Sequence, residues 1–454
     1  MSHYGAVESD GLLETHAHEQ KRVAGPVETH VQRKTQNLRN IAAGTLLFLG
    51  CVLLAFLVTS LYMPQRGGPR RMGRLDATSQ TFMYSSLSEE EQTTLFADFI
   101  SHFGKTYTTD SDEYATRFSY FKTTLSVIDE RNAAEQAAMG EGVHGITKFA
   151  DLSQEEFEST YLLERYEEED EYSGTDRRKR RGLNALLVQK KKDEALKIKS
   201  SMFRRVLQEI VSSDVSASAT LVDWSASGIT TPVNDQGTGC RGASWAFAAI
   251  EQIESDAIRK GYLTTADTLS VQQLLDCNTG STGCESGSLE SAYDYSSKIN
   301  GGLLHWASQY PYAASSSECA SADSGYAATL GSYATVTKYH NEEYGYTTTQ
   351  VESNMLAHLV ATGPLSACLD ASTWNTYVSG TLTACEGTTI NQCVQIVGVY
   401  YDPVSDTGYY KLRNSWGTDF GEDGYIRLAH GVNACDVVYN PGYTDPAESL
   451  SRRR

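Results

Sequence analysis

Basic residues are scarce in this chain of 454 residues, and their scarcity limits the partners that it can bind. Lysine and arginine number 38 against 57 aspartates and glutamates, which gives a formal net charge of −19 at pH 7. Such a charge repels a phosphate backbone, so we expect no nucleic-acid partner. Cysteines are also few, because nine in a chain of this length do not make a small disulfide-dense scaffold. The length instead predicts two or three domains with hydrophobic cores.

Charge is missing altogether from Ile41–Met63, a run of 23 residues. A helix of this length crosses a hydrocarbon core of about 30 Å, and no polar stripe marks it as the amphipathic helix of a soluble domain. Because forty residues precede it, we predict a transmembrane signal anchor rather than a cleaved signal peptide. Basic residues flank the run on both sides, so charge alone does not decide its orientation.

The cysteines that follow the predicted membrane helix favour one orientation. Disulfides persist in oxidising compartments, so the part after the helix is expected in a lumen or outside the cell, on the secretory or endolysosomal route. We therefore predict a single-pass type II membrane protein with a cytosolic tail at residues 1–40 and a linker at 64–87. No Asn-X-Ser/Thr sequon follows residue 63, so glycosylation gives no help with topology.

Two amphipathic helices are predicted between Ser88 and Ala138. The first places Phe96, Phe99 and Phe103 on one face through their spacing of three and four residues. The second has an interrupted pattern of polar and apolar residues: Glu113, Arg117, Phe121, Thr124, Ile128 and Asn132. A short motif follows in the stretch GITKFADLSQEEF, which contains Gly145, Phe149 and Asp151.

A segment with blocks of opposite charge occupies residues 161–217. Acidic residues at 167–171 precede the basic runs Arg177–Arg181 and Lys190–Lys192. Charge runs bury little apolar surface, so we predict disorder here. Two interpretations stay open: a cleavage site for a protease that recognises basic residues, or a solvated linker without further function.

The last half of the chain carries several motifs in a fixed order. It begins with LVDWSASGITTPVNDQG at Leu221, continues with GCRGASWAF at Gly239 and LLDCNTGSTGCESG at Leu274, and ends with NSWG at Asn414 and GEDGYIRL at Gly421. In this order, and behind the two helix motifs above, these segments resemble a cathepsin L-like proenzyme of the papain family of cysteine peptidases. The resemblance covers residues 88 to about 443 without the charged segment.

The resemblance implies a fold class and domain limits. We expect an α+β, two-lobed papain-like fold at 218–446, with a helical lobe, a β-barrel-like lobe and a cleft between them. A helical inhibitory prodomain at 88–160 and the transmembrane helix precede it, and a basic tail follows at 447–454. Helical periodicity predicts a helix from Ser244 to Lys260, with Gly261 as its C-cap.

The resemblance also implies three disulfides. The expected pairs are Cys240 with Cys284, Cys277 with Cys319, and Cys385 with Cys435. Two further cysteines, Cys368 and Cys393, fall at positions that line the main specificity pocket of the family. They either pair and narrow this pocket or remain small buried hydrophobes, and the second state is the commoner one for free cysteines.

The residues expected to perform catalysis differ from those of the family. The nucleophile position, at the start of the long helix, holds Ser244 instead of cysteine, and the histidine position holds Gln392. A hydroxyl needs a general base to become a nucleophile, and an amide cannot supply one. Asn414, which would orient the histidine, is retained, and so is Trp416, which would shield the histidine and border the bound peptide. We therefore expect no peptidase activity by the usual mechanism.

Two other positions bear on the expected cleft. Gln236 matches the donor of the oxyanion hole, but it lies eight positions before Ser244 where the family has six, so we expect the donor or the loop to be displaced. Gly287, whose position presents backbone to an extended peptide, is retained, whereas Ser286 replaces a glycine. The resemblance implies neither a cofactor nor a metal.

Three functions are compatible with these residues. The first is a membrane-tethered pseudopeptidase whose cleft binds an extended peptide or a protein, its own prodomain included. The second is an active endopeptidase that uses Ser244 with an unrecognised base. The third is a structural or tethering protein whose cleft is filled by its prodomain. We favour the first, because the nucleophile and the base are both replaced.

Overall fold

The computed structural model describes residues 83–164, 219–299, 303–320, 326–336, 347–385, 389–402 and 407–447. The predicted membrane segment 41–63, the tails and almost all of the charged segment lie outside these ranges. Among the residues described, no helix has both the length and the apolar character that a membrane crossing needs. The described prodomain continues to Glu164, four residues past its predicted end at 160 and into the predicted charged segment.

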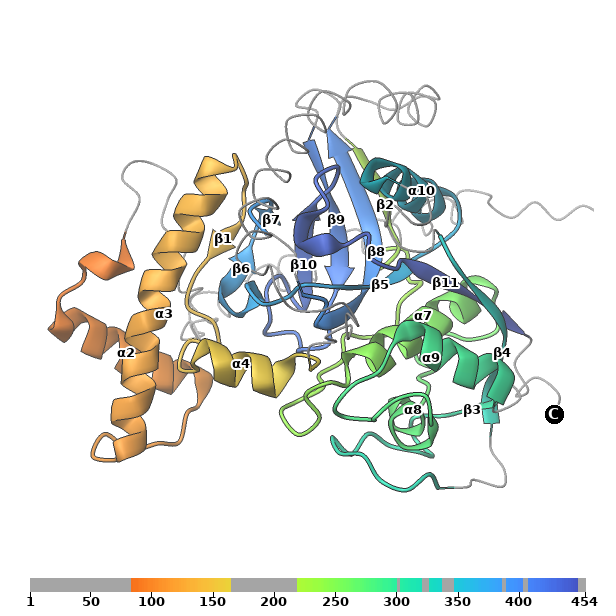
Figure 1. The fold of residues 1–454 in the computed structure, drawn as a ribbon, viewed down its shortest axis with the longest axis horizontal. Helices are drawn as coiled ribbons and strands as arrows, with labels where there is room; N and C mark the ends of the chain where they lie inside the picture. Colours follow the sequence, from red (N-terminus) through yellow and green to blue (C-terminus); the bar gives the residue numbers. More distant parts are fainter. Residues whose placement is uncertain are drawn as a thin grey trace, which may run out of the picture. The chain divides into compact units, whose positions relative to one another are not determined.

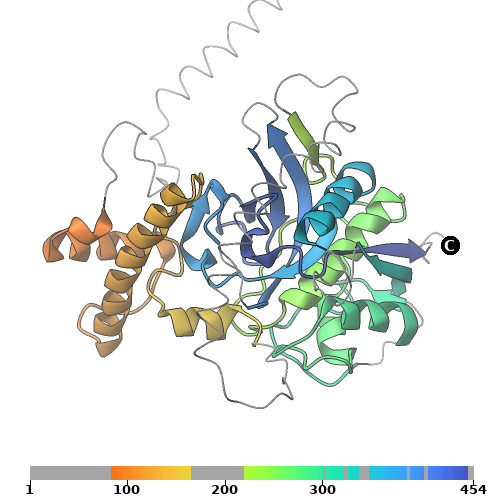
Figure 2. The ribbon, with the colours of Figure 1, turned by 45° about the horizontal axis from the view of Figure 1, so that its top comes forward.

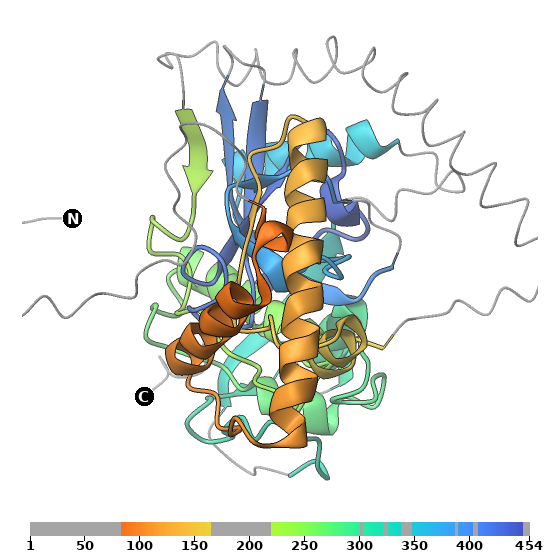
Figure 3. The ribbon, with the colours of Figure 1, turned by 90° about the vertical axis from the view of Figure 1, so that its left-hand side faces the viewer.

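Two long helices build the prodomain. Helix α2 (Glu89–Phe103) begins at a capping box of Ser88 and Glu91 and ends at Gly104, whose φ of 63° is left-handed. Helix α3 (Asp112–Ala137) follows a short loop and packs against α2. Figure 3 shows the long α3 with α2 at an angle to it. A short 3₁₀ turn, η1 (Tyr84–Ser86), precedes α2.

The core of the prodomain is largely aromatic. Phe96 and Phe99 are fully buried, and Phe121, Leu125 and Ile128 of α3 complete the cluster with them. The ring centroids of Phe96 and Phe121 lie 5.0 Å apart. The periodicity of phenylalanines in α2 thus marks its buried face, as predicted, although Phe103 is only partly buried.

The residues of the two prodomain motifs contact one another. Arg117 of α3 donates to Glu156 at 2.6 Å. Asn132 exchanges two hydrogen bonds with the backbone of His144, at 3.0 and 2.9 Å. The carboxylate of Asp151 accepts from Lys105 at 2.8 Å. These bonds fix the segment that follows α3 against that helix, and this segment continues to the peptidase domain.

The last prodomain elements lie against the peptidase domain. Strand β1 (Val143–His144) pairs antiparallel with β6 (Tyr377–Ser379). Helix α4 (Gln154–Tyr161) begins at a second capping box, made by Ser153 and Glu156. Figures 1 and 2 show α4 between α3 and the helices of the peptidase domain.

Helices form one lobe of the peptidase domain. The longest is α7 (Ser244–Arg259), which is buried along almost its whole length. It ends one residue before the predicted end, and Gly261 has the left-handed φ of 72° that was expected near its C-terminus. The other helical elements of this lobe are α8 (Val271–Cys277), α9 (Leu289–Asp294) and the π-helical turn η2 (Tyr295–Ile299).

A nine-stranded sheet forms the other lobe and extends toward the helical one. Its order is β3-β4-β11-β5-β8-β9-β10-β7, with β2 also paired to β8. The strands are β2 (Ala219–Asp223), β3 (Leu303–His305), β4 (Tyr326–Thr335), β5 (Leu365–Leu369), β7 (Thr381–Leu382), β8 (Gln392–Asp402), β9 (Thr407–Arg413), β10 (Tyr425–Ala429) and β11 (Gly442–Ala447). Pairing among the described residues joins these strands in a path from β3 to β7.

The central strand β8 connects the sheet to the helical lobe. Its residues are almost all buried, because β5 and β9 flank it and α7 and α10 (Thr348–Ala361) contact it. Two apolar cores result, one around β8 and Trp416 and the other around α7. Two 3₁₀ turns, η3 (Trp374–Thr376) and η4 (Ala434–Asp436), lie in the loops of the β-rich lobe. Ser244 and Gln392 are therefore the first residues of two buried elements that meet.

Candidate functional site

Ser244 begins α7 at the junction of the two lobes. Its side chain is fully buried, and its Oγ accepts a hydrogen bond of 3.1 Å from the backbone N–H of Cys393 in β8. No side chain caps this helix, since the N-cap residue is Ala243. The N-terminal turn of a helix favours negative charge, so the position would stabilise an ionised nucleophile. A serine hydroxyl stays neutral there unless a base removes its proton.

Gln392 and Asn414 form a pair beside Ser244. Gln392 Nε2 donates to Asn414 Oδ1 at 2.7 Å, and the same oxygen accepts from the backbone N–H of Ser415 at 2.9 Å. Both side chains are fully buried. Gln392 Oε1 and Asn414 Nδ2 have no hydrogen-bond partner among the described residues. The pair thus holds an amide where the resemblance predicts an imidazole.

No described group takes the place of a general base. The hydrogen bonds and ion pairs of the described residues do not join Ser244 to any histidine or carboxylate. His358 stacks on Tyr443, and burial lowers its pKa to about 4. His305 lies in β3, and burial lowers its pKa as well. His430 lies against the rings of Tyr401 and Tyr410. The described histidines of the peptidase domain therefore pack against other elements.

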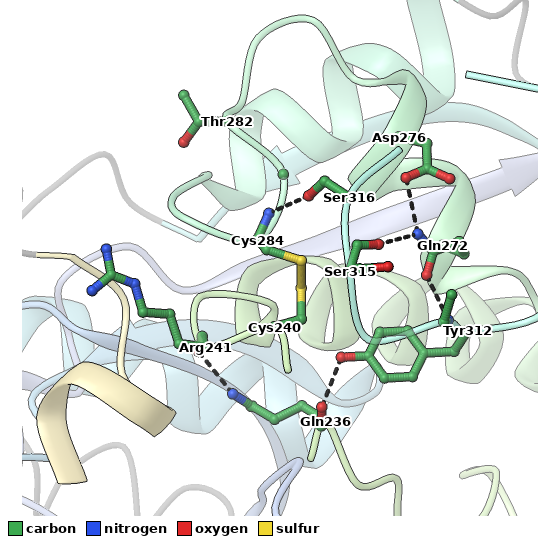
Figure 4. The surroundings of a disulfide bond; sticks show 12 residues. Gln236, Cys240, Arg241, Gln272, Asp276, Thr282, Cys284, Tyr312, Ser315 and Ser316 are labelled. Atoms are coloured by element: carbon green, nitrogen blue, oxygen red, sulfur yellow. Dashed lines mark hydrogen bonds between the residues drawn. A yellow bond between two sulfur atoms is a disulfide. The ribbon is translucent and has the colours of Figure 1, made fainter. Parts of the chain in front are cut away.

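Gln236 is close to this site, but its polar atoms are occupied. Its Nε2 donates to the carbonyl of Arg241 at 2.8 Å and to that of Tyr161 at 3.1 Å. Its Oε1 accepts from Ser415 Oγ at 2.8 Å. Figure 4 shows its side chain directed toward Arg241 and its backbone carbonyl held by Tyr312. One of the two carbonyls that this amide binds thus belongs to the prodomain.

The loop from Gln236 to Ser244 is fixed by a disulfide and by close backbone contacts. Cys240 pairs with Cys284, and the N–H of Gly242 donates to the carbonyl of Cys284 at 2.8 Å (Figure 4). A Cβ on Gly239 would lie 2.5 Å from the carbonyl oxygen of Ala314, so only glycine fits without a shift. The longer loop expected from the sequence is therefore built against the segment around Ala314.

Four disulfides occur among the described residues. Three join the pairs that the resemblance implies, Cys240 with Cys284, Cys277 with Cys319, and Cys385 with Cys435. The fourth joins Cys368 to Cys393, which corrects the expectation of two free buried cysteines. The two residues lie directly opposite each other in the β5–β8 ladder, which brings their sulfurs within bonding reach. Sequence spacing gave no register for these strands, so it could not decide between the alternatives.

Trp416 is covered by aromatic rings of the prodomain. Its ring centroid lies 5.6 Å from that of Phe149, 5.5 Å from that of Phe157 and 6.0 Å from that of Tyr161. Trp374 and Phe420 of the peptidase domain also contact its ring, and its side chain is fully buried. The backbone carbonyl of Trp416 also accepts from Lys148 at 2.6 Å. The side chain that was expected to border a peptide site therefore borders the prodomain.

The other predicted peptide-binding positions are also buried or tightly packed. A Cβ on Gly287 would lie 2.3 Å from the ring of Trp245, so packing alone requires glycine here. Cys368 and Cys393 are 4% and 1% exposed. Contact of these three residues with an added peptide stays a prediction.

The end of the prodomain passes between the two lobes. The N–H of Leu163 donates to the carbonyl of Asn391 at 2.8 Å, directly before Gln392. The Leu162 side chain packs in the core around Trp416, whereas Leu163 packs in the core around α7. Tyr161–Glu164 therefore occupies the junction at which Ser244 and Gln392 lie.

Sequence reasoning missed the polar residues of α3 that hold the prodomain. Arg131 Nη1 donates to the carbonyl of Thr373 at 3.1 Å, and to Asn375 Oδ1 and Thr376 Oγ1 at 2.6 Å each. Burial lowers the pKa of Arg131 to about 10. One turn further, Glu135 accepts from backbone N–H groups of the loop after β7. In the sequence, only the position of Arg131 and Glu135 near Asn132 on the same predicted helix could have pointed to this role.

Comparison with known proteins places these features in a family. The profile described as "Papain family cysteine protease" matches residues 218–444, and "Cathepsin propeptide inhibitor domain (I29)" matches 96–157. Cysteine proteinase B of Leishmania mexicana is 32% identical over 357 residues, which cover 79% of this chain and 70% of the relative. Ananain of Ananas comosus is 30% identical over 77% of this chain and 86% of its own.

Solved proenzymes have the same fold. Digestive procathepsin L2 of Tenebrio molitor superposes with a TM-score of 0.57 at 26% identity, over 78% of this chain and 99% of that chain. The recombinant stem bromelain precursor gives 0.56 at 27% identity, over 78% and 98%. This chain belongs to the papain family of cysteine peptidases and has the proenzyme fold, with a cathepsin-type propeptide inhibitor domain in front of the peptidase domain.

Proposed function

We propose that this chain is a membrane-anchored, papain-family pseudopeptidase whose cleft holds an extended peptide without cutting it. One observation carries the proposal: the amide of Gln392 is bonded to Asn414 beside Ser244. In this arrangement an amide stands where the reaction needs an imidazole. An amide neither accepts a proton from the hydroxyl nor returns one to a leaving amine near neutral pH.

The size of the expected loss supports this choice over residual serine chemistry. General acid–base catalysis alone contributes about 10²- to 10⁴-fold in rate. In an unrelated serine peptidase, the loss of the nucleophile or of the histidine costs about 10⁶-fold in turnover. The oxyanion donor offers little compensation, because the amide hydrogens of Gln236 are already donated to two carbonyls.

Membrane anchoring is the second part of the proposal. The 23 uncharged residues at 41–63 support a single helix across the bilayer. Four disulfides support an oxidising lumen or the cell exterior for the peptidase domain. Residues 1–40 then form a cytosolic tail and 64–87 a linker. The prodomain, predicted at 88–160, continues in the described structure to Glu164. The rest of the predicted segment 161–217 is then a charged linker, before the peptidase domain at 218–446 and a basic tail at 447–454.

A tethering role with a permanently filled cleft is the alternative that a specific contact favours. The prodomain segment Tyr161–Glu164 already lies at the junction, and the Leu163 N–H is bonded to Asn391. A protein of this kind would bind no added peptide even after its prodomain is loosened. Peptide capture therefore separates this alternative from the pseudopeptidase.

The test compares variants of one chain in which the prodomain is loosened by Phe157→Ala. This background is assayed alone, with Ser244→Ala, and with Ser244→Cys and Gln392→His together. A diverse peptide mixture is the substrate, and mass spectrometry identifies new termini. We expect cleavage only in the Cys/His variant, which also proves that the cleft is open. Cleavage by the Ser244 chain that disappears in Ser244→Ala would instead establish a serine peptidase.

A further inference from the structure

One prodomain residue sits at the junction in a way that indicates what the cleft accepts. Leu163 is 8% exposed and belongs to the buried cluster that contains Trp245, Cys368 and Cys393. Its N–H donates to the carbonyl of Asn391 at 2.8 Å. The backbone of Leu162, directly before it, is extended. An extended approach and an aliphatic side chain are therefore bound together at this point.

Glu164, the next residue, lies close to Arg241, the only arginine in the loop from Gln236 to Ser244. Glu164 Oε2 lies 3.3 Å from Arg241 Nη2. The same nitrogen donates to Glu285 Oε2 at 2.6 Å. Arg241 and Glu164 also line one hollow together with Leu163 and Asn391. The guanidinium thus faces the occupant of the cleft directly.

Contacts within the peptidase domain also hold Arg241 in place. Its backbone carbonyl accepts from Gln236, and the neighbouring Cys240 is fixed to Cys284 (Figure 4). Glu285 holds the other end of the side chain. Arg241 is 28% exposed, so it remains accessible to a ligand, and little side-chain entropy is lost when a carboxylate arrives. An arginine can serve two carboxylates at once because of its forked, permanently charged head.

We infer that the cleft selects an extended peptide in which an aliphatic residue is followed directly by an acidic one, and that Arg241 recognises the acidic side chain. This inference rests on the proposed peptide-binding function and names its ligand class. The segment Leu163–Glu164 is then the internal ligand, and an added peptide with the same pair competes with it. The Arg241–Glu164 pair is partly exposed, so we expect a preference for Glu over Gln of about two- to fivefold.

The internal ligand is tested in the full chain by hydrogen exchange of Tyr161–Glu164. We expect Arg241→Gln and Glu164→Gln each to speed exchange about two- to fivefold, and the double variant to do no more than either. Lys411→Gln is the control, since it removes a cation of similar exposure that pairs with Asp223 within the peptidase domain. Additive effects of the two substitutions, or an equal effect of Lys411→Gln, would overturn the inference. A thermal transition equal to that of the natural chain excludes misfolding.

The ligand class is tested with peptides in trans. The receptor is the full chain with Leu163→Ala and Glu164→Gln, which weakens the internal ligand. Photoreactive peptides of sequence Tyr-Leu-Leu-X-Arg, with X as Glu, Gln or Lys, are crosslinked at equal concentration. We expect capture in the order Glu, Gln, Lys, and loss of the order when Arg241→Gln is added. Equal capture of all three would refute the role of Arg241 but leave peptide binding intact, whereas capture of none would refute the proposed function itself.

Discussion

Substitution of Phe157 by alanine should release α4 from the peptidase domain. Phe157 is fully buried, and its ring lies 5.5 Å from that of Trp416 and 5.3 Å from that of Phe149. Removal of a buried phenylalanine side chain costs about 3–5 kcal/mol. Because each 1.4 kcal/mol is a factor of ten, the opening equilibrium of α4 should rise about a hundredfold to several thousandfold.

Hydrogen exchange followed by mass spectrometry measures this opening directly. In Phe157→Ala, amides of α4 should exchange faster by the factor above, while those of α2 keep their protection. Phe99→Ala is the matched control, because Phe99 is equally buried but lies in the core of the prodomain itself. It should speed exchange in α2. The reasoning is refuted if α4 stays protected in Phe157→Ala, or if α2 and α4 open together in both variants.

Three further predictions concern pH, a buried ion pair and the thiol count. Burial, and then the charge of Arg131, lower the pKa of His144 to about 3. The unfolded chain therefore binds more protons between pH 6.5 and 3, so stability should fall on acidification through this window; urea titrations should show a smaller fall in His144→Gln. Arg413→Met should lower the free energy of unfolding by about 3–5 kcal/mol, since it leaves Glu251 buried without its partner. The double variant Arg413→Met with Glu251→Leu should lose less stability in the same urea assay, and an equal or larger loss would contradict this prediction. Alkylation of the unreduced, unfolded chain should add one label, at Cys51, since eight of the nine cysteines are paired; three labels would exclude one of the four disulfides.

Most of the fold could be predicted from motifs in the sequence. The helix at Ser244 was predicted to within one residue of its end, because the apolar spacing and Gly261 are local signals. The aromatic face of α2 was readable for the same reason. Strand order in the sheet was not readable, because it depends on contacts between segments far apart in the chain.

The site was predicted as a set of positions but not as a set of contacts. The resemblance assigned Gln392 to the histidine position and Asn414 to the residue that would orient it, yet the sequence gave no sign that the two side chains are hydrogen-bonded. It also gave no sign that the Gln236 side chain donates a hydrogen bond to the carbonyl of Tyr161 in the prodomain. Such details depend on side-chain direction, which periodicity does not encode. The pairing of Cys368 with Cys393 followed only from the register of β5 and β8.

The prodomain is attached to the peptidase domain at several separate places. They are the polar contacts of Arg131, the β1–β6 pairing, the rings around Trp416 and the bond of Leu163 to Asn391. None of the four disulfides joins the two described domains. A cut at Arg177–Arg181 would therefore yield a two-chain protein held by noncovalent contacts alone. Docking would then lose the high effective concentration that an intact linker provides, and the prodomain would become a subunit that dilution removes and a free copy replaces.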